Sequence, residues 1–385
     1  MLRFLTAGES HGPGLVTIVE GLPAGLPVAS SVIGHELARR RLGFGRGKRM
    51  QVEADELEIL GGVRHGRTIG APVAVLVRNS EWPKWQEIMS PDPGGSGKPV
   101  TRPRPGHADL TGMLKYDTGD ARDVLERASA RETAARTVAG VLARSLLSEI
   151  GVAVVSHVTA IGSVSYDGPA PGPDDQEATD ASEVRCIDEA GSRGMAEAIT
   201  RAMEDKDTLG GVFEVLAYGA PPGLGSYVQF DRRLDGLLAA AFMSIPAIKG
   251  VEIGAGFRSA AASGLEAHDE IRLEEGTLVR ATNRAGGIEG GMSNGETIIV
   301  RAAMKPISTL MSPLQTVDMT TGEPAQAVRE RSDVCAVPAA AVVGEQMICW
   351  VLASESVRKY GGDTVGDYLA SHRGYMSRVQ ERSNP

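Results

Sequence analysis

The sequence predicts one large α+β unit, with two similar halves arranged around shared helices. Each half combines short runs rich in β-branched residues, a long apolar helix pattern and glycine-rich turns. No segment recurs at a fixed period, which argues against a solenoid or a propeller. A length of 385 residues allows two ordinary domains or one large one. We expect a single domain over residues 1–385.

The first half is predicted to begin with strands on either side of a helix. Residues 15–20 are a β-branched run between two glycines, and residues 71–77 are a similar run. Between them, residues 31–41 are typical of a short helix that serines cap at its start. Residues 131–150 form the clearest helix, because apolar side chains recur at three- and four-residue steps and a glycine follows.

The second half repeats these patterns after a polar segment. Residues 163–183 are rich in Pro, Gly, Asp and Ala, so we expect a solvated loop or insertion there. One helix pattern ends at Pro246 and the last long one begins just after Pro338, as the backbone of proline requires. The elements predicted in this part are strands at 152–161, 211–218 and 295–304 and helices at 194–204, 234–245 and 339–359.

Charge and composition exclude several classes of protein. The net charge of −9 argues against a general nucleic-acid binder, which would be basic. The N-terminus lacks a basic stretch followed by an apolar one, and no apolar run approaches the roughly 18 residues of a membrane span. Three widely spaced cysteines fit a reduced, cytoplasmic protein, with Cys335 and Cys349 as small core residues.

Several common functional motifs are incomplete, absent or in the wrong structural context in this sequence. The glycine-rich stretch at 43–48 lacks the first glycine and the final Ser or Thr of a Walker A loop. No Gly-x-Gly-x-x-Gly joins a strand to a helix, and no spacing is typical of metal ligands, so we expect no bound metal. Gly-x-Ser-x-Gly occurs at 8–12 and 291–295, but each match runs into a strand pattern, which argues against a serine hydrolase.

An arginine-rich stretch is the most unusual feature of the sequence. Residues 37–52 contain six basic and no acidic side chains, five of them arginines. The arginine fork matches phosphate or carboxylate in a bidentate manner, which lysine cannot do. The stretch is either an anion-binding segment, a solvated basic face or a nucleic-acid patch, although the last would favour more aromatic residues than Phe44 alone.

Further polar segments have the chemistry of an active site. His11 is flanked by glycines and titrates near neutrality, so it is either a proton donor or an incidental loop histidine. In 101–109 two prolines restrict the directions of Arg102, Arg104 and His107. Small residues in 127–133 would expose backbone N–H groups to a phosphate at a helix start, or form an ordinary cap.

Two segments near the C-terminus complete the set. Residues 304–309 place a lysine, a proline and two hydroxyls at the end of a strand, which suits a polar cofactor edge. Asp333 lies between Arg331 and an apolar run, a setting that can shift a carboxyl pKa. Each of these segments is weak evidence alone, since ordinary polar turns have the same composition.

Taken together and in this order, the segments resemble the chorismate synthase family. The match spans nearly the whole chain, and the ordered set is highly specific although each member is short. The segments that carry it are 6–12, 39–50, 102–109, 126–133, 290–295, 305–309 and 331–335.

The resemblance implies both a reaction and a fold. Members of the family are carbon–oxygen lyases that convert 5-enolpyruvylshikimate 3-phosphate to chorismate, the last common step of the shikimate pathway to aromatic amino acids. The 3-phosphate and a ring hydrogen leave in a 1,4-elimination that needs reduced FMN without net redox change. The implied fold is a β-α-β sandwich, with antiparallel sheets packed on a central helical layer and an internal pseudo-repeat, assembled as a homotetramer.

The resemblance also implies roles for individual residues. His11 would give a proton to the leaving phosphate, His107 would protonate the flavin ring system, and Asp333 would help remove the ring proton through the flavin. The implied substrate clamps are Arg40, Arg46, Arg49, Arg104 and Arg131. The implied FMN contacts are Arg127, Ala128, Ser129, Pro246, Ala247, Gly290, Lys305, Pro306, Ile307, Ser308, Thr309 and Arg331.

The chain departs from the family pattern at two places. Many members have Arg-His-Asp-Pro-Cys where this chain has Arg-Ser-Asp-Val-Cys at 331–335, and many have Asn at the position of Pro246. Some members reduce their own flavin with NADPH, but the missing dinucleotide fingerprint leads us to expect an external NADPH-linked reducing system. The alternatives are an FMN oxidoreductase acting on another anionic substrate and an RNA-associated protein that uses the arginine cluster.

Overall fold

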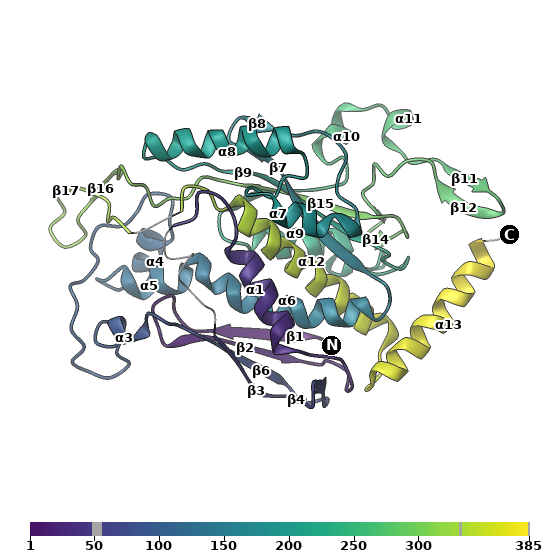
Figure 1. The fold of residues 1–385 in the computed structure, drawn as a ribbon, viewed down its shortest axis with the longest axis horizontal. Coiled ribbons are helices and arrows are strands. Elements are labelled where there is room, and N and C mark those ends of the chain that lie inside the picture. The colour runs from purple at the N-terminus through teal and green to yellow at the C-terminus, as the bar shows by residue number, and fades with distance from the viewer. Residues whose placement is uncertain (48–55, 331–332, 384–385) are drawn as a thin grey trace.

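Two antiparallel sheets and the helices between them make up the body of the fold in a computed structural model, which describes residues 1–47, 56–330 and 333–383 (Figure 1). The first sheet has the order β1-β2-β6-β3, and the second has the order β10-β15-β9-β7-β8. The strands of the first are β1 (Arg3–Ala7), β2 (Gly14–Glu20), β6 (Val73–Arg78) and β3 (Leu57–Gly61). Those of the second are β10 (Ile248–Ile253), β15 (Ile298–Met304), β9 (Gly211–Tyr218), β7 (Ala153–Ile161) and β8 (Val164–Ser165).

Alternation of side chains gives each sheet one face for the core. In β6 the side chains of Val73, Val75 and Val77 are fully buried, while the residues between them are less so. Thr17 of β2 lies on the same inner face, and its hydroxyl donates to the carbonyl of Ala135 at 2.8 Å. The predicted antiparallel sheets packed against helices are therefore confirmed.

Three helices form the layer that both sheets contact: α1 (Ser30–Arg41), α6 (Thr133–Ser148) and α12 (Val337–Tyr360). The helix α12 packs against α6 on one side and against β7 and β9 on the other, while α6 contacts β2. By length and composition α12 could cross a membrane, but 89% of its apolar window is buried within the protein. It is accordingly the central helix of the core.

The helices α6 and α12 approach each other closely at Gly140. A Cβ atom added there would lie 2.2 Å from Gln346 Cβ and 2.7 Å from the Gln346 carbonyl oxygen. We predict that Gly140→Ala lowers the free energy of unfolding by at least about 2 kcal/mol, because the two helices must separate. In the control Gly34→Ala on α1, the added methyl meets only Leu57 Cδ2 at 3.7 Å. The free energy of unfolding of that variant, measured in urea, should rise by about 0.5–1 kcal/mol, because alanine favours the helix more than glycine does. A Gly140→Ala variant with the same urea midpoint as wild type would contradict the prediction.

A buried network of charges ties the three helices together. Glu345 of α12 is fully buried, and its carboxylate accepts hydrogen bonds from Arg39 of α1 at 2.8 and 3.0 Å. Arg144 of α6 and Arg185 reach the same carboxylate at 2.6 and 3.1 Å. Burial alone would raise the pKa of Glu345, but the three guanidinium groups outweigh it and hold that pKa well below its ordinary value.

Most predicted elements are confirmed, and three details are corrected. The α1 helix begins at Ser30 with Ala29 as its N-cap and no side-chain cap, so the predicted serine capping is wrong. The segment 163–183 is only partly a loop, since it contains β8 and the short helix α7 (Gln176–Ala181), whose Asp180 pairs with Arg39 at 2.7 Å. The helix predicted at 131–150 begins at Thr133, after the 3₁₀ turn η1 (Ala130–Glu132). Cys335 and Cys349 are buried, as expected.

The remaining elements surround this body. An extension formed by α10, α11 and the β11–β12 hairpin projects away from the second sheet, and α13 projects from the end of α12 (Figure 1). The remaining helices are α3 (Trp82–Trp85), α4 (Asp109–Tyr116), α5 (Arg122–Ala128), α8 (Glu189–Glu204), α9 (Leu234–Met243), α10 (Phe257–Ala261), α11 (Gly264–Ala267), α13 (Val365–Ser383) and the 3₁₀ turns η2 (Pro173–Asp175) and η3 (Phe230–Arg232). The short strands are β4 (Val63–Arg64), β5 (Arg67–Thr68), β11 (Ile271–Glu274), β12 (Thr277–Arg280), β13 (Ile288–Glu289), β14 (Met292–Ser293), β16 (Gln315–Val317) and β17 (Pro324–Gln326).

Candidate active site

His11 lies in the β1–β2 loop and is held by a carboxylate from α5. Its backbone N–H donates to Glu126 Oε2 at 2.9 Å, and its Nδ1 lies 2.9 and 3.0 Å from the two oxygens of the same carboxylate. Burial opposes ionisation of Glu126, but the hydrogen bonds from His11 and the charge of Arg122 lower its pKa. The ring of His11 also stacks on Trp85, with centroids 3.8 Å apart.

The turn from α5 into η1 is fastened to the same loop. The guanidinium of Arg127 donates to the carbonyl of Gly8 at 3.0 Å and to the hydroxyl of Thr6 at 2.7 Å. The hydroxyl of Ser129 lies 3.2 Å from that of Ser10. The expected cofactor residues 127–129 therefore lie beside the His11 loop.

Two of the expected substrate arginines lie near the start of α6. Arg40 is buried at the end of α1, and its Nη1 is 3.3 Å from the hydroxyl of Thr133. Arg131 is buried in η1, and its backbone N–H donates to the hydroxyl of Ser129 at 3.3 Å. The guanidinium of Arg40 thus reaches the region of η1, where backbone N–H groups of a helix start also attract anions. The guanidinium of Arg131 extends the other way, and its Nη2 lies 3.5 Å from the carbonyl of Arg78 at the end of β6.

His107 belongs to a second cluster, which is centred on the buried carboxylate of Asp109. The Nδ1 of His107 forms a short hydrogen bond to Asp109 Oδ1, and Arg104 Nε donates to Oδ2 at 2.8 Å. Burial acts to raise the pKa of Asp109, but the bonds from His107 and Arg104 hold it well below its ordinary value. Arg104 Nη1 also donates to the hydroxyl of Thr309 at 2.9 Å, so the predicted segments 101–109 and 304–309 meet here.

The cofactor run 305–309 lies against the His107 loop. Lys305 Nζ donates to the carbonyl of Gly106 at 2.5 Å, and the backbone N–H of Lys305 donates to the carbonyl of Ala247 at 2.9 Å. Gly106 has a φ of +78°, and a Cβ there would lie 3.4 Å from Lys305 Nζ and 3.6 Å from Ser308 Cβ. A side chain at position 106 would fill the space between the two segments, which favours glycine.

Asp333 pairs with the arginine-rich stretch. Arg46 Nη1 lies 2.7 Å from Asp333 Oδ2, and the backbone N–H of Gly47 donates to Oδ1 at 2.7 Å. Next to it, the N–H of Val334 donates to the carbonyl of Gly45 at 2.8 Å. Valine at position 334, unlike proline, has a backbone N–H, and this donor fastens the loop to the arginine stretch.

Backbone contacts connect these clusters to one another. Thr208 donates through its hydroxyl to the carbonyl of Ile307 at 2.8 Å, and the next residue, Leu209, donates to the carbonyl of Val334 at 2.9 Å. The helices α4 and α5, which carry Asp109 and Glu126, pack on each other through buried Met113 and Leu125. The segments around His11, His107, Lys305 and Asp333 are thereby connected to one another.

Some predicted residues are placed elsewhere or lie outside the description. Gly290 is in the β13–β14 turn, where Gly291 accepts from the N–H of Leu234 at the start of α9. Pro246 and Ala247 follow the other end of that ten-residue helix, which at 1.5 Å per residue is about 15 Å away. Arg49 and Arg331 lie outside the described residues.

Sequence reasoning gave no role to three residues of the site. Glu126 and Asp109 lay within the segments that carry the resemblance, but only their pairing with His11 and His107 reveals what they do. No motif or spacing in the sequence indicated that Trp85 belongs to the site. The i,i+4 spacing of Arg122 and Glu126, which form an ion pair at 2.9 Å, could have indicated a carboxylate held in place on a helix.

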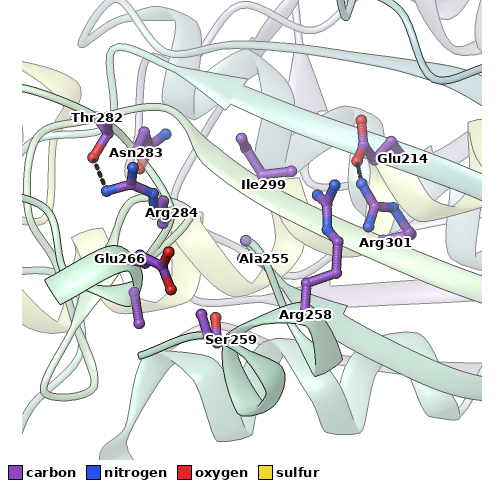
Figure 2. Close-up of a pocket in the computed structure, with 13 residues that line it drawn as sticks. Glu214, Ala255, Arg258, Ser259, Glu266, Thr282, Asn283, Arg284, Ile299 and Arg301 are labelled. Carbon is purple, nitrogen blue, oxygen red and sulfur yellow. Dashed lines mark hydrogen bonds and ion pairs between the residues drawn. The ribbon is translucent and has the colours of Figure 1, made fainter. Parts of the chain in front are cut away.

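A pocket of about 480 Å³ lies elsewhere, on the outer face of the second sheet (Figure 2). Its walls include Glu214, Ile299 and Arg301 from the strands, with Arg258 and Arg284 from the extension. None of the predicted site residues lines it. The candidate site is therefore defined by converging side chains and not by this pocket.

The donors of the candidate site fit a phosphate-bearing cofactor and an anionic substrate. Lys305 and Arg127 offer cations, and Ser129, Ser308 and Thr309 offer hydroxyls. Arg46 Nε is buried and has no hydrogen-bond partner among the described residues. In the described part of the chain, no group of three or more His, Cys, Asp and Glu side chains is placed to hold a metal ion.

The fold and the site have the chemistry of an enzyme that acts on an anionic substrate, with arginines beside histidines that carboxylates hold in place. A family model described as chorismate synthase matches residues 2–357. The chain is 58% identical to the chorismate synthase of Parafrankia sp. (strain EAN1pec) over 394 aligned positions, covering 99% of this chain and 100% of the relative. It is 56% identical to that of Leifsonia xyli subsp. xyli (strain CTCB07), covering 99% and 97%.

A solved structure described as a crystal structure of chorismate synthase is also similar. It superposes with a TM-score of 0.80 at 40% identity and covers 99% of this chain and 98% of its own. The chain belongs to the chorismate synthase family. Its reaction is the conversion of 5-enolpyruvylshikimate 3-phosphate to chorismate in the shikimate pathway, by a phosphate-eliminating carbon–oxygen lyase of a family that uses reduced FMN.

Proposed function

We propose that the region around His11, His107 and Asp333 is the site of this elimination, and that the three residues handle its protons. The observation that carries the proposal is that each is fixed by a charged partner: His11 by Glu126, His107 by Asp109, and Asp333 by Arg46. His11 protonates the oxygen of the departing phosphate, which neutralises charge as the C–O bond breaks.

The arginines bind the three anionic groups of the substrate, one phosphate and two carboxylates. Arg40 and Arg131 are supported by their burial near η1. Arg46 and Arg104 are each anchored through one edge by a carboxylate, so that their planes are oriented before substrate arrives. Arg49 is assigned to the substrate-binding arginines by the family resemblance alone.

Residues 127–129, 246–247 and 305–309 are proposed to hold FMN, with Gly290 and Arg331 assigned by the family resemblance. When bound, reduced FMN supplies transient electron density to the substrate and regains it without net redox change. His107 holds a proton beside the ring system, through the Nδ1–Asp109 contact that orients its imidazole. Asp333 would help to remove the proton from the substrate ring, as the family resemblance implies. The hydroxyls of Ser308 and Thr309 and the ammonium of Lys305 suit the phosphate of the cofactor.

The decisive experiment is an anaerobic assay with reduced FMN and 5-enolpyruvylshikimate 3-phosphate. We expect phosphate release over many turnovers while the absorbance of the flavin shows no net oxidation. Oxidation of one flavin for each product would favour an FMN oxidoreductase on an anionic substrate. Tight, salt-sensitive RNA binding without phosphate release would favour the RNA-associated alternative.

Replacing Lys305 with methionine should weaken FMN binding at least about tenfold, because one charge-assisted hydrogen bond is lost. The measurement is a titration of FMN fluorescence under conditions where the variant is folded. Lys249→Met is the matched control, since Lys249 is exposed on β10 in the adjoining sheet. Equal dissociation constants for the two variants would remove Lys305 from the proposed cofactor set.

We further propose a homotetramer that works in the cytoplasm with an external NADPH-linked flavin-reducing system. The self-association is supported by the extension from the second sheet, where Phe257 and Leu265 are 80% and 98% exposed. A single domain over residues 1–385 with an internal pseudo-repeat is supported by a shared plan. Each half contains a long helix packed on an antiparallel sheet, α6 on β2 and α12 on β7 and β9. Sedimentation equilibrium tests the tetramer. Activity with NADPH alone would refute the need for an external reductase.

A further inference from the structure

The carboxylate of Glu126 determines which nitrogen of His11 carries the proton. Its pKa is lowered despite burial, so it is an ionised group that can only accept hydrogen bonds. It faces the backbone N–H of His11 at 2.9 Å and the ring Nδ1 at 2.9 and 3.0 Å. Each of these contacts therefore requires a hydrogen on the histidine side, and Nδ1 must be protonated.

The surroundings prevent both partners from turning away. Arg122 Nη1 donates to Glu126 Oε1 at 2.9 Å and so holds the carboxylate through a second partner. Trp85 covers one face of the imidazole at an interplanar angle of 24°, and the Arg122 guanidinium lies 5.3 Å from the Trp85 ring centroid. The Glu126 side chain is 1% exposed, so water does not compete for its oxygens.

We propose that Glu126 is a positioning residue that commits the Nδ1 of His11 to a retained proton and so makes Nε2 the atom that exchanges a proton with the phosphate oxygen. This inference rests on the proposed role of His11 as proton donor. In the step itself, the C–O electron pair goes to the phosphate oxygen and the Nε2 proton is transferred to that oxygen. His11 is left neutral with its proton on Nδ1, the form that Glu126 stabilises.

The direct test observes the wild-type protein, and a variant serves only to assign its signals. The protein has seven histidines, so selective ¹⁵N labelling gives few signals, and His11→Gln identifies those of His11. At about pH 9, where an ordinary imidazole is neutral, we expect the Nδ1 of His11 to be protonated and Nε2 to be unprotonated. A spectrum with the proton on Nε2 would overturn the proposal even if the Glu126 variants failed to fold.

The kinetic test uses Glu126→Gln, which keeps the shape of the side chain but has one acceptor oxygen instead of two. Arg122, the His11 N–H and Nδ1 then compete for that oxygen, and the amide NH₂ can meet Nδ1. We expect kcat to fall at least about tenfold with KM within about threefold of wild type, and Glu126→Asp to recover part of the loss. The ¹⁵N spectrum of the Gln variant should show the population with a protonated Nδ1 reduced.

Glu214→Gln is the matched control, because it alters another buried His–Glu contact, which lies in the second sheet. There, His157 Nε2 is 3.2 Å from Glu214 Oε2. It should lower stability without changing kcat. If Glu126→Gln keeps kcat within threefold while His11→Ala is inactive, the positioning role is wrong and the proposed function stands. If His11→Ala itself retains activity, the proposed role of His11 fails, which is a different outcome.

Discussion

Replacing His11 with alanine is expected to lower kcat for phosphate release by about 10²- to 10⁴-fold, the usual contribution of a positioned acid. The departing phosphate must take up positive charge as the C–O bond breaks, and His11 is the imidazole that the β1–β2 loop and Glu126 fix in place. Stopped-flow measurement of single-turnover phosphate release, with enzyme saturated by reduced FMN, isolates this step from flavin reduction.

The fold should survive this change, because His11 lies in a loop outside the hydrophobic core and the backbone N–H of position 11 can still donate to Glu126. His11→Ala should therefore bind FMN within about threefold of wild type and keep its circular dichroism spectrum. His35→Ala is the control, since His35 is an exposed histidine on α1. Near-normal turnover of His11→Ala would show that His11 is not the proton donor, whatever the activity of His35→Ala.

The elements that sequence predicts best are those in which local pattern and tertiary environment agree. The strand predicted at 211–218 coincides with β9, because its apolar run fits the centre of a sheet. The loop predicted at 163–183 was partly wrong because its composition indicates solvation, whereas Asp180 in α7 is drawn inward by Arg39 and Arg185. Such a pairing joins distant segments and leaves no local signal.

The arginine-rich stretch shows the same limit within the site. From sequence, its six basic residues form one cluster, which is either an anion-binding segment, a solvated basic face or a nucleic-acid patch. In the structure, Arg39 and Arg40 diverge because successive residues of a helix point about 100° apart: Arg39 enters the buried network and Arg40 reaches Thr133. Arg46, beyond the helix, pairs with Asp333. Composition located the charge, but only the helix geometry separates structural from candidate substrate-binding arginines.

The second large effect is on stability, and we predict that Glu345→Gln lowers the free energy of unfolding at pH 7 by about 3–5 kcal/mol. Glutamine fits the space, but it leaves Arg39, Arg144 and Arg185 buried around an amide that carries no charge. Equilibrium urea unfolding measures the loss. Glu58→Gln, which removes an ion pair to Arg78 with both side chains about half exposed, should change stability by less than about 1 kcal/mol.

The pH dependence gives this prediction a second, independent signature. The pKa of Glu345 in the folded protein lies below its ordinary value of 4.5, so the ionised carboxylate stabilises the fold fully above pH 4.5. That contribution is lost as the pH falls toward the folded-state pKa, because the unfolded chain takes up a proton first. The difference in unfolding free energy between wild type and Glu345→Gln should therefore be constant from neutral pH to about pH 5 and shrink below it. A difference below about 1 kcal/mol at pH 7, or one that grows on acidification, would show that the three arginines are compensated without Glu345 and that the network does not hold α1, α6 and α12 together.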